Sequence, residues 1–199
     1  MEMKMGKGEL KSDELLCKGM KVLWTKGYNG TSVNDIVQAA EVPKGSFYFY
    51  FDSKEDFAVK AIEKYFEHEF APSKEILMDK SKSPKQRLLE FYTFRCSVLK
   101  NELDFKMGCM ACNLANEMAD HSEKIRKAVL INEEIVKNMI SKVVEEAQVL
   151  GEIDSSLNAR DLVVFFEDAG KGTMITMKEM KSHYPVDNYM NMLKKFLFV

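Results

Sequence analysis

The sequence has no excess of positive charge, no long hydrophobic run and no regular cysteine framework. Lys and Arg number 29 against 31 Asp and Glu, so charge alone gives no argument for nucleic acid as a partner. No apolar run reaches the roughly eighteen residues of a membrane-spanning helix, and segment 1–10 lacks the apolar core of a signal peptide. With four irregularly spaced cysteines, these absences predict a protein of the reducing cytoplasm.

Histidine is scarce as well, and the chain contains only His68, His121 and His183. A Cys–His hydrolase or transferase needs a nucleophile and an oriented base. Each of these histidines falls in or beside a helical pattern, and none accompanies a nucleophile motif. We therefore expect no catalytic residues, no cofactor and no enzyme activity.

Proline and glycine are also few, and they fall between segments whose apolar residues repeat at helical spacing. Gly27 predicts the end of a first helix, Thr31 is the expected cap of the second, and Ser53 with Asp56 resembles a capping box before a long fourth helix. No segment alternates as a strand does. The predicted fold is all-α with about nine helices, near residues 10–26, 31–40, 43–48, 53 onward, 84–101, 109–120, 122–150, 158–181 and 185–198.

The stretch "EVPKGSFYFYFDSKEDF", residues 41–57, holds six aromatic rings. Two short helices joined by the brief turn at Glu41–Val42 have the form of a helix-turn-helix, whose second helix enters the major groove of DNA. Its first residues, Lys44, Gly45 and Ser46, suit that position. Lysine reaches guanine or phosphate, glycine admits close backbone approach, and serine hydrogen-bonds either. The competing interpretation of Lys44 is a solvated surface lysine.

The rings divide by expected role. We predict that Phe47, Phe51 and Phe57 close the small core of the three helices. The hydroxyls of Tyr48 and Tyr50 are positioned to hydrogen-bond phosphates, with Tyr50 equally suited to a core position. Lys54, in the first turn of the following helix, is also expected to meet the DNA backbone.

The whole run "GYNGTSVNDIVQAAEVPKGSFYFYFDSKEDF" resembles the DNA-binding head of the TetR family of transcriptional regulators. The family pattern departs at Phe49, where many members carry histidine; a polar phosphate contact is lost there or replaced by ring packing. Residues 1–55 are thus the predicted helix-turn-helix domain, and 56–199 the effector-binding and dimerisation domain. The predicted DNA contacts are Thr31, Ser32, Lys44, Gly45, Ser46, Tyr48, Phe49, Tyr50 and Lys54.

The resemblance implies a homodimeric repressor, less often an activator, that binds a roughly palindromic operator and responds to a small inducer in its helical body. The last two predicted helices are the expected dimer interface, by a four-helix arrangement, with intrachain core as the alternative. Their apolar residues are Leu162, Phe165, Phe166, Ile175, Met192, Leu193 and Phe196.

A pocket for a small hydrophobic effector is expected among the middle helices, because methionine and aromatic residues suit adaptable cavities. Ordinary core packing is the more frequent role of any one such residue. The candidates are Phe91, Tyr92, Phe94, Cys96, Met110, Met118, Met139 and Phe165.

The segment "KMGCMACN" adds a candidate sensor. Gly108 is expected to begin a helix, which places Cys109 in the first turn, where the pKa of a thiol is lowered. The alternative is that Cys109 and Cys112 are small buried apolar residues; neither zinc spacing nor a thioredoxin-like context is present. Gly108–Cys109 resembles the electrophile- and oxidant-sensing branch of the TetR family, in which the thiol has a lysine partner, here Lys178.

A helical carrier of small molecules that does not bind DNA is the other class of protein compatible with this pattern. A carrier has no use for Lys44, Gly45 and Ser46 on a short exposed helix. Loss of operator binding with intact ligand binding in Lys44→Ala and Tyr48→Phe variants separates the two classes.

Overall fold

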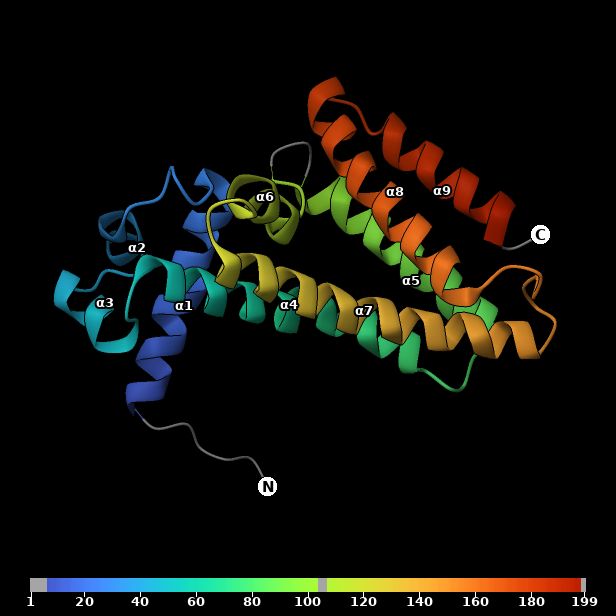
Figure 1. The fold of residues 1–199 in the computed structure, drawn as a ribbon, viewed down its shortest axis with the longest axis horizontal. Helices are drawn as coiled ribbons and strands as arrows, with labels where there is room; N and C mark the ends of the chain where they lie inside the picture. Colours follow the sequence, from blue (N-terminus) through green and yellow to red (C-terminus); the bar gives the residue numbers. More distant parts are fainter. Residues whose placement is uncertain (1–6, 104–106, 198–199) are drawn as a thin grey trace. The chain divides into compact units, whose positions relative to one another are not determined.

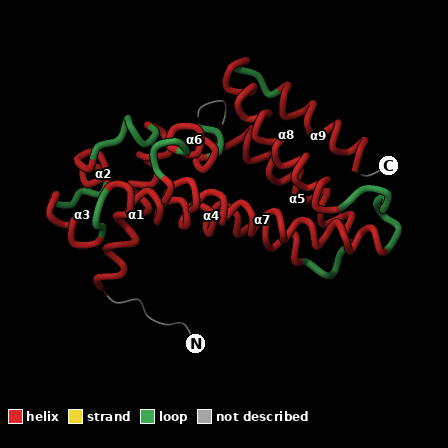
Figure 2. Tube along the Cα trace, in the orientation of Figure 1, coloured by secondary structure: helices red, strands yellow, loops and turns green. Residues whose placement is uncertain are grey.

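The computed structural model describes residues 7–103 and 107–197, and this part of the chain is helical with no strand. Figures 1 and 2 show the helices and the short loops that join them. The prediction of an all-α fold with about nine helices is confirmed. The described helices are α1 (Lys7–Lys26), α2 (Val33–Ala39), α3 (Lys44–Tyr50), α4 (Lys54–Met78), α5 (Pro84–Val98), a π-helical turn (Leu99–Leu103), α6 (Met110–Met118), α7 (Glu123–Val149), α8 (Ala159–Met180) and α9 (Tyr184–Leu197).

The described residues pack as two compact units, each built from two stretches of chain. The first unit comprises the chain up to Glu67 together with Met110–Leu130, and the second comprises His68–Cys109 together with the chain from Ile131. Helices α4 and α7 therefore contribute residues to both units. The functional division at residue 55 stays a prediction.

The first helix ends where the sequence predicts. Gly27 adopts φ 75°, a left-handed conformation that glycine takes without a steric penalty. Its N–H donates to the carbonyl of Leu23 at 2.9 Å. The chain then turns through Tyr28 and Asn29 toward α2.

The predicted cap of α2 is one residue wrong. Ser32, not Thr31, is the N-cap: its hydroxyl accepts from the N–H of Asp35, and the Asp35 carboxylate accepts from the N–H of Ser32. This reciprocal capping box depends on the three-residue spacing from Ser32 to Asp35. Thr31 is instead buried, and its hydroxyl donates to the carbonyl of Gly27 at 2.6 Å, closing the turn.

The later helix starts agree more closely with the sequence. The N–H of Asp56 donates to the Ser53 hydroxyl at 3.0 Å, as predicted, but the Asp56 carboxylate accepts from the N–H of Asp52 rather than closing a capping box. Asn158 caps α8 by accepting from the N–H of Asp161. Hydrogen bonds from nearby side chains thus fix where several of the helices begin.

The second unit is organised around a buried arginine. Arg87 of α5 is 2% exposed, and its Nη1 donates to the carbonyl of Leu77, near the end of α4, at 2.8 Å. Its Nη2 pairs with Glu146 of α7, which also accepts from Lys80 at 2.6 Å. Arg87 thereby joins three helices.

Helices α8 and α9 lie side by side and antiparallel (Figure 1). Along the described ranges, no helix combines the length and apolarity needed to cross a bilayer.

Candidate nucleic-acid interface

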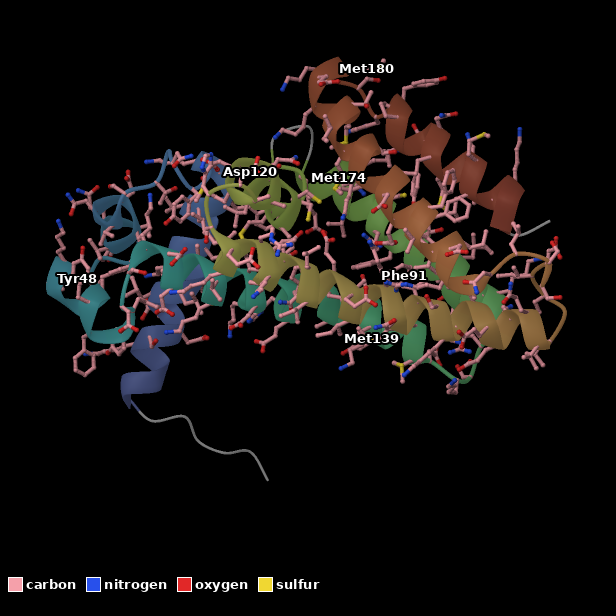
Figure 3. The ribbon with its side chains drawn as sticks, viewed as in Figure 1. Tyr48, Phe91, Asp120, Met139, Met174 and Met180 are labelled. Atoms are coloured by element: carbon pink, nitrogen blue, oxygen red, sulfur yellow. The ribbon has the colours of Figure 1, made fainter. Side chains whose placement is uncertain are left out.

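Helix α3 divides into a buried face and an exposed face. Phe47 and the adjoining Phe51 are buried, whereas Tyr48 is 57% exposed and Phe49 is 80% exposed. Lys44 and Gly45 are exposed as well. Figure 3 marks the side chain of Tyr48 on this helix. The outward face of α3 therefore carries a cation, a phenol, a phenyl ring and a position without a side chain.

The buried rings form the core that the sequence predicts. Phe57 of α4 lies 5.7 Å from Phe47 and 5.0 Å from Phe51, measured between ring centroids. All three rings are buried against one another and against the rest of the unit. The expected core roles of Phe47, Phe51 and Phe57 are confirmed, and the remaining rings of α3 are left for other contacts.

The turn between α2 and α3 has helix-turn-helix geometry with one strained residue. The N–H of Val42 donates to the carbonyl of Val37 at 3.0 Å, which closes the end of α2. Glu41 adopts φ 58°, a conformation that costs an L-residue roughly 1–2 kcal/mol. Helix α3 begins directly after this turn, with Pro43 at its N-cap position.

The other predicted DNA contacts occupy varied positions. Ser32 is exposed at the start of α2, Ser46 and Tyr50 are half-buried, and Thr31 is buried. The ring of Tyr50 lies against both Phe49 and Phe51. The contacts of these residues with DNA stay predictions.

Lys54 stabilises the turn between α1 and α2 by hydrogen bonds. Its ammonium donates to the carbonyls of Tyr28 and Thr31, each at 3.0 Å, and lies 4.1 Å from the centroid of the Tyr28 ring. Its contact with a phosphate stays a prediction. Its intramolecular role is to position the turn that precedes the helix-turn-helix.

A carboxylate from α6 holds the same turn, and sequence reasoning did not identify it. Glu117 Oε2 accepts from the N–H of Tyr28 at 2.7 Å, and Oε1 accepts from the N–H of Asn29 at 2.6 Å. Gly27 lies so close that a Cβ there would stand 2.7 Å from Glu117 Oε2. Tyr28 and Glu117 are separated by 89 positions along the chain, so no local spacing reveals the contact.

A second polar contact joins the segment after α6 to the start of α4. The hydroxyl of Ser122 donates to Glu55 at 2.6 Å, and Lys124 approaches the same carboxylate at 3.4 Å. The hydrogen bond from Ser122, followed by Lys124, lowers the pKa of Glu55 below its ordinary value. Residues 110–130 are thus bonded to both the turn and the long helix of the first unit.

The predicted effector residues do not share one environment. Met110 and Met118 belong to the first unit, and the others belong to the second. Phe91 and Tyr92 are buried with their centroids 4.9 Å apart, Cys96 is buried, and Phe165 is 64% exposed. Phe94, Cys109, Met139 and Lys178 are half-buried; Figure 3 labels Phe91 and Met139. Their roles in binding an effector stay predictions.

An ion pair and a second tyrosine hydroxyl lie near the buried Tyr92. Arg95 Nη1 donates to both carboxylate oxygens of Glu167 at 2.7 and 2.9 Å, and the hydroxyl of Tyr189 donates to the carbonyl of Phe166 at 3.1 Å. The Tyr92 hydroxyl makes no hydrogen bond of normal geometry to a described residue. Burial, and then the nearby Glu167, raise the pKa of Tyr92 well above its ordinary value, so this hydroxyl keeps its proton.

The candidate sensor lies just before α6 rather than inside it. The helix begins at Met110, so the predicted start at Gly108 is wrong and Cys109 precedes the first turn. Gly108 adopts φ 64°, a left-handed turn residue that delays the helix. A Cβ on Gly108 would lie 3.5 Å from Cδ of Lys178, so the lysine side chain passes over this turn.

Two of the other thiols have a pKa above the ordinary value for cysteine. Burial raises the pKa of Cys96 to about 11, and burial followed by Asp13 raises the pKa of Cys17. Because the thiolate is the reactive form, a raised pKa lowers the reactivity of each thiol near neutral pH.

Among the described residues, no three His, Cys, Asp or Glu side chains lie close enough together to bind a metal ion.

Comparison with known proteins agrees with this geometry along most of the chain. Residues 15–61 match the family model described as bacterial regulatory proteins of the tetR family, and residues 84–193 match the tetracyclin repressor-like C-terminal domain. The transcriptional repressor DhaR of Mycobacterium sp. is 32% identical over 90% of this chain and 88% of its own length. The repressor NemR of Escherichia coli is 31% identical over 59% of this chain and 58% of its own.

Solved structures agree as well. The regulatory protein TetR from Rhodobacter sphaeroides superposes with a TM-score of 0.86 at 28% identity, covering 96% of this chain and all of that one. The chain belongs to the TetR family of transcriptional regulators. It has the family's helix-turn-helix DNA-binding domain and is not an enzyme, as the sequence predicts. Regulators of this family bind DNA operators and act as dimers.

Proposed function

We propose that this protein is a cytoplasmic homodimeric repressor that occupies a palindromic operator and leaves it when its body meets an electrophile or a small hydrophobic effector. The observation that carries the DNA-binding part is the outward face of α3, where Lys44, Tyr48 and Phe49 stand exposed above a buried ring core. The relatives DhaR and NemR, both named repressors, support repression over activation.

The face of α8 and α9 supports dimerisation through these two helices. Phe165, Ile175 and Met192 are exposed, whereas Phe166 and Leu193 are buried within the unit. An apolar face left uncovered in one subunit is typical of a homodimer contact. Leu162 is half-buried, and Phe196 lies outside the residues whose side chains are described.

The turn at Gly108–Cys109 supports release by thiol modification. Cys109 is half-buried, and the side chain of Lys178 passes over the adjacent glycine. A nearby ammonium favours the thiolate form of cysteine. In the reaction with a maleimide, the thiolate sulfur bonds to one alkene carbon and water protonates the other, with no leaving group.

The connection to DNA runs through α6. This helix begins directly after Cys109 and ends with Glu117 and Met118, and Glu117 holds the turn that precedes α2. A change at Cys109 that displaces α6, or that tilts α4, moves the two recognition helices of the dimer out of register with successive major grooves, about 34–36 Å apart. A coupling of about 1–3 kcal/mol is enough for such a switch.

The first experiment establishes the operator. Purified protein is incubated with random duplex DNA, retained fragments are sequenced, and affinity for the enriched site is measured by fluorescence anisotropy. We expect a near-palindromic site and weaker binding by Lys44→Ala and Tyr48→Phe variants that remain folded dimers. A selection that enriches no sequence rejects the regulator proposed here and favours a carrier.

The second experiment tests the trigger on the same operator. N-ethylmaleimide is added to the wild type, to Cys109→Ser and to the matched neighbour Cys112→Ser. We expect release of the wild type and of Cys112→Ser, but continued binding by Cys109→Ser. If Cys109→Ser is released as readily as the wild type, the thiol trigger at Cys109 is rejected while operator binding stands.

A further inference from the structure

The outward face of α3 is apolar at its centre. With 100° between successive residues of a helix, Phe49 lies on the opposite side of α3 from the buried Phe47. Gly45, one turn earlier, shares its face, and a Cβ added there would meet nothing within 4 Å. The side chain of Phe49 is therefore the bulky group that this face carries outward, with the phenol of Tyr48 beside it.

The exposed ring of Phe49 is linked to the buried rings through Tyr50. Phe49 meets Tyr50 edge to face with centroids 4.9 Å apart, and Tyr50 meets Phe51 at 6.5 Å. Phe51 in turn packs on the buried Phe57 at 5.0 Å. This row of rings connects Phe49 to the core of the head.

The chemistry of the major groove limits what such a ring can recognise. Base edges there present hydrogen-bond donors and acceptors, and the 5-methyl group of thymine is their apolar feature. A phenyl ring has no hydrogen-bond donor for phosphate. Gly45 removes the side chain that would keep the helix away from the base edges.

We propose that Phe49 is a specificity-determining residue that packs on the 5-methyl group of one thymine in each half-site of the operator. This inference rests on the proposed function, because it needs α3 to lie in the major groove. It differs from a general contact with the sugar–phosphate backbone, which carries no preference for thymine over uracil.

The test removes the methyl group without changing base pairing. In the operator obtained by selection, each symmetry-related pair of thymines is replaced in turn by deoxyuridine, and the affinities of wild type and Phe49→Ala are measured at one fixed salt concentration. Burial of one methyl-sized group corresponds to about a fourfold change in affinity, or about fifteenfold for two half-sites. We expect one thymine pair to show that loss in the wild type and none in Phe49→Ala.

The matched control is Tyr48→Phe, which keeps all the rings and removes one hydroxyl. It is expected to bind the operator more weakly and yet to retain the full penalty for deoxyuridine at the same position. If the wild type binds its operator tightly and no thymine pair shows a methyl effect that disappears in Phe49→Ala, the inference is overturned. Because operator binding itself is measured in every arm, that failure is distinct from a failure of the proposed function.

Discussion

Glu41 carries a left-handed backbone conformation at the turn between α2 and α3, with φ 58°. Glycine adopts this conformation without a penalty, whereas a side chain with a Cβ is strained there. The residue is also an exposed acid next to the recognition helix. Substitutions at Glu41 can therefore separate the effect of its backbone conformation on stability from the effect of its charge.

We predict that Glu41→Gly raises the free energy of unfolding by about 0.5–1 kcal/mol, because the relief of strain exceeds the extra entropy of the unfolded glycine. Urea denaturation monitored by circular dichroism measures it. Glu41→Ala removes the charge and keeps the Cβ, so it serves as the control. A gain in Glu41→Ala equal to that in Glu41→Gly would show that charge, and not backbone strain, is responsible.

The residues whose positions the sequence predicts best make their contacts with residues that are close to them along the chain. Phe47 and Phe51 are predictable because their i, i+4 spacing places them on the same side, and Phe57 follows them closely at the start of the next helix. The predicted N-cap of α2, Thr31, is one residue from the observed one, because Ser32 also satisfies the capping spacing. The predicted start of α6, Gly108, is two residues early, because Gly108 forms a turn before the helix begins. Glu117 was not predictable at all, since its partners are 89 and 88 positions away.

At the scale of elements, α6 contributes to the head through the carboxylate of Glu117. Hydrogen bonds to charged acceptors contribute about 1.5–3 kcal/mol each, less where water competes. We predict that Glu117→Ala lowers the stability of the protein by about 1–3 kcal/mol and weakens operator binding. Hydrogen exchange at the amides of Tyr28 and Asn29, together with anisotropy on the operator, measures both effects.

Glu123→Ala is the control for this contact, because Glu123 is exposed and pairs with Arg126 and Lys127 of its own helix. It is expected to change stability by less than about 0.5 kcal/mol. Unchanged exchange rates at Tyr28 and Asn29 in Glu117→Ala would contradict the role of α6 in holding the turn.

The contacts among α4, α5 and α7 give the second unit a dependence on pH. Hydrogen bonds from Lys80 and then from Arg87 lower the pKa of Glu146 below its ordinary value. A carboxyl with a lowered folded-state pKa stabilises the native state above its unfolded-state pKa, and that stabilisation is lost as pH falls through the folded-state value. Acid therefore removes this contribution.

We predict that Glu146→Gln lowers the free energy of unfolding at pH 7 by about 1–2 kcal/mol, and that its difference from the wild type shrinks as the pH falls below the ordinary pKa of a glutamate, about 4.3. Urea titrations at a series of pH values provide the measurement. Glu145→Gln, an exposed neighbour on α7, is expected to follow the wild type throughout. A constant difference between Glu146→Gln and wild type at all pH values would rule out this ion pair as the source.

At the scale of the whole molecule, DNA binding requires two heads, and the apolar face of α8 and α9 is the proposed contact between subunits. We predict that Phe165→Glu and Ile175→Glu each shift the protein toward monomer at micromolar concentration and weaken operator binding at least about tenfold, because a charge is buried at the contact. Analytical ultracentrifugation measures the first effect and anisotropy the second.

Val149→Glu introduces the same charge at an exposed apolar position at the end of α7, outside this face. It is expected to leave both the dimer and the operator affinity unchanged. A Phe165→Glu variant that sediments as the wild-type dimer would move the interface elsewhere.

The first compact unit is discontinuous in sequence, because residues 110–130 pack with the chain that precedes Glu67. Any attempt to express a minimal DNA-reading fragment by cutting the gene after α4 therefore discards Glu117 and Ser122 with their bonds to the head. The same applies to chimaeric regulators. A graft of this head onto a foreign sensor transfers its folding information intact only if the donor supplies α6 and the start of α7 as well.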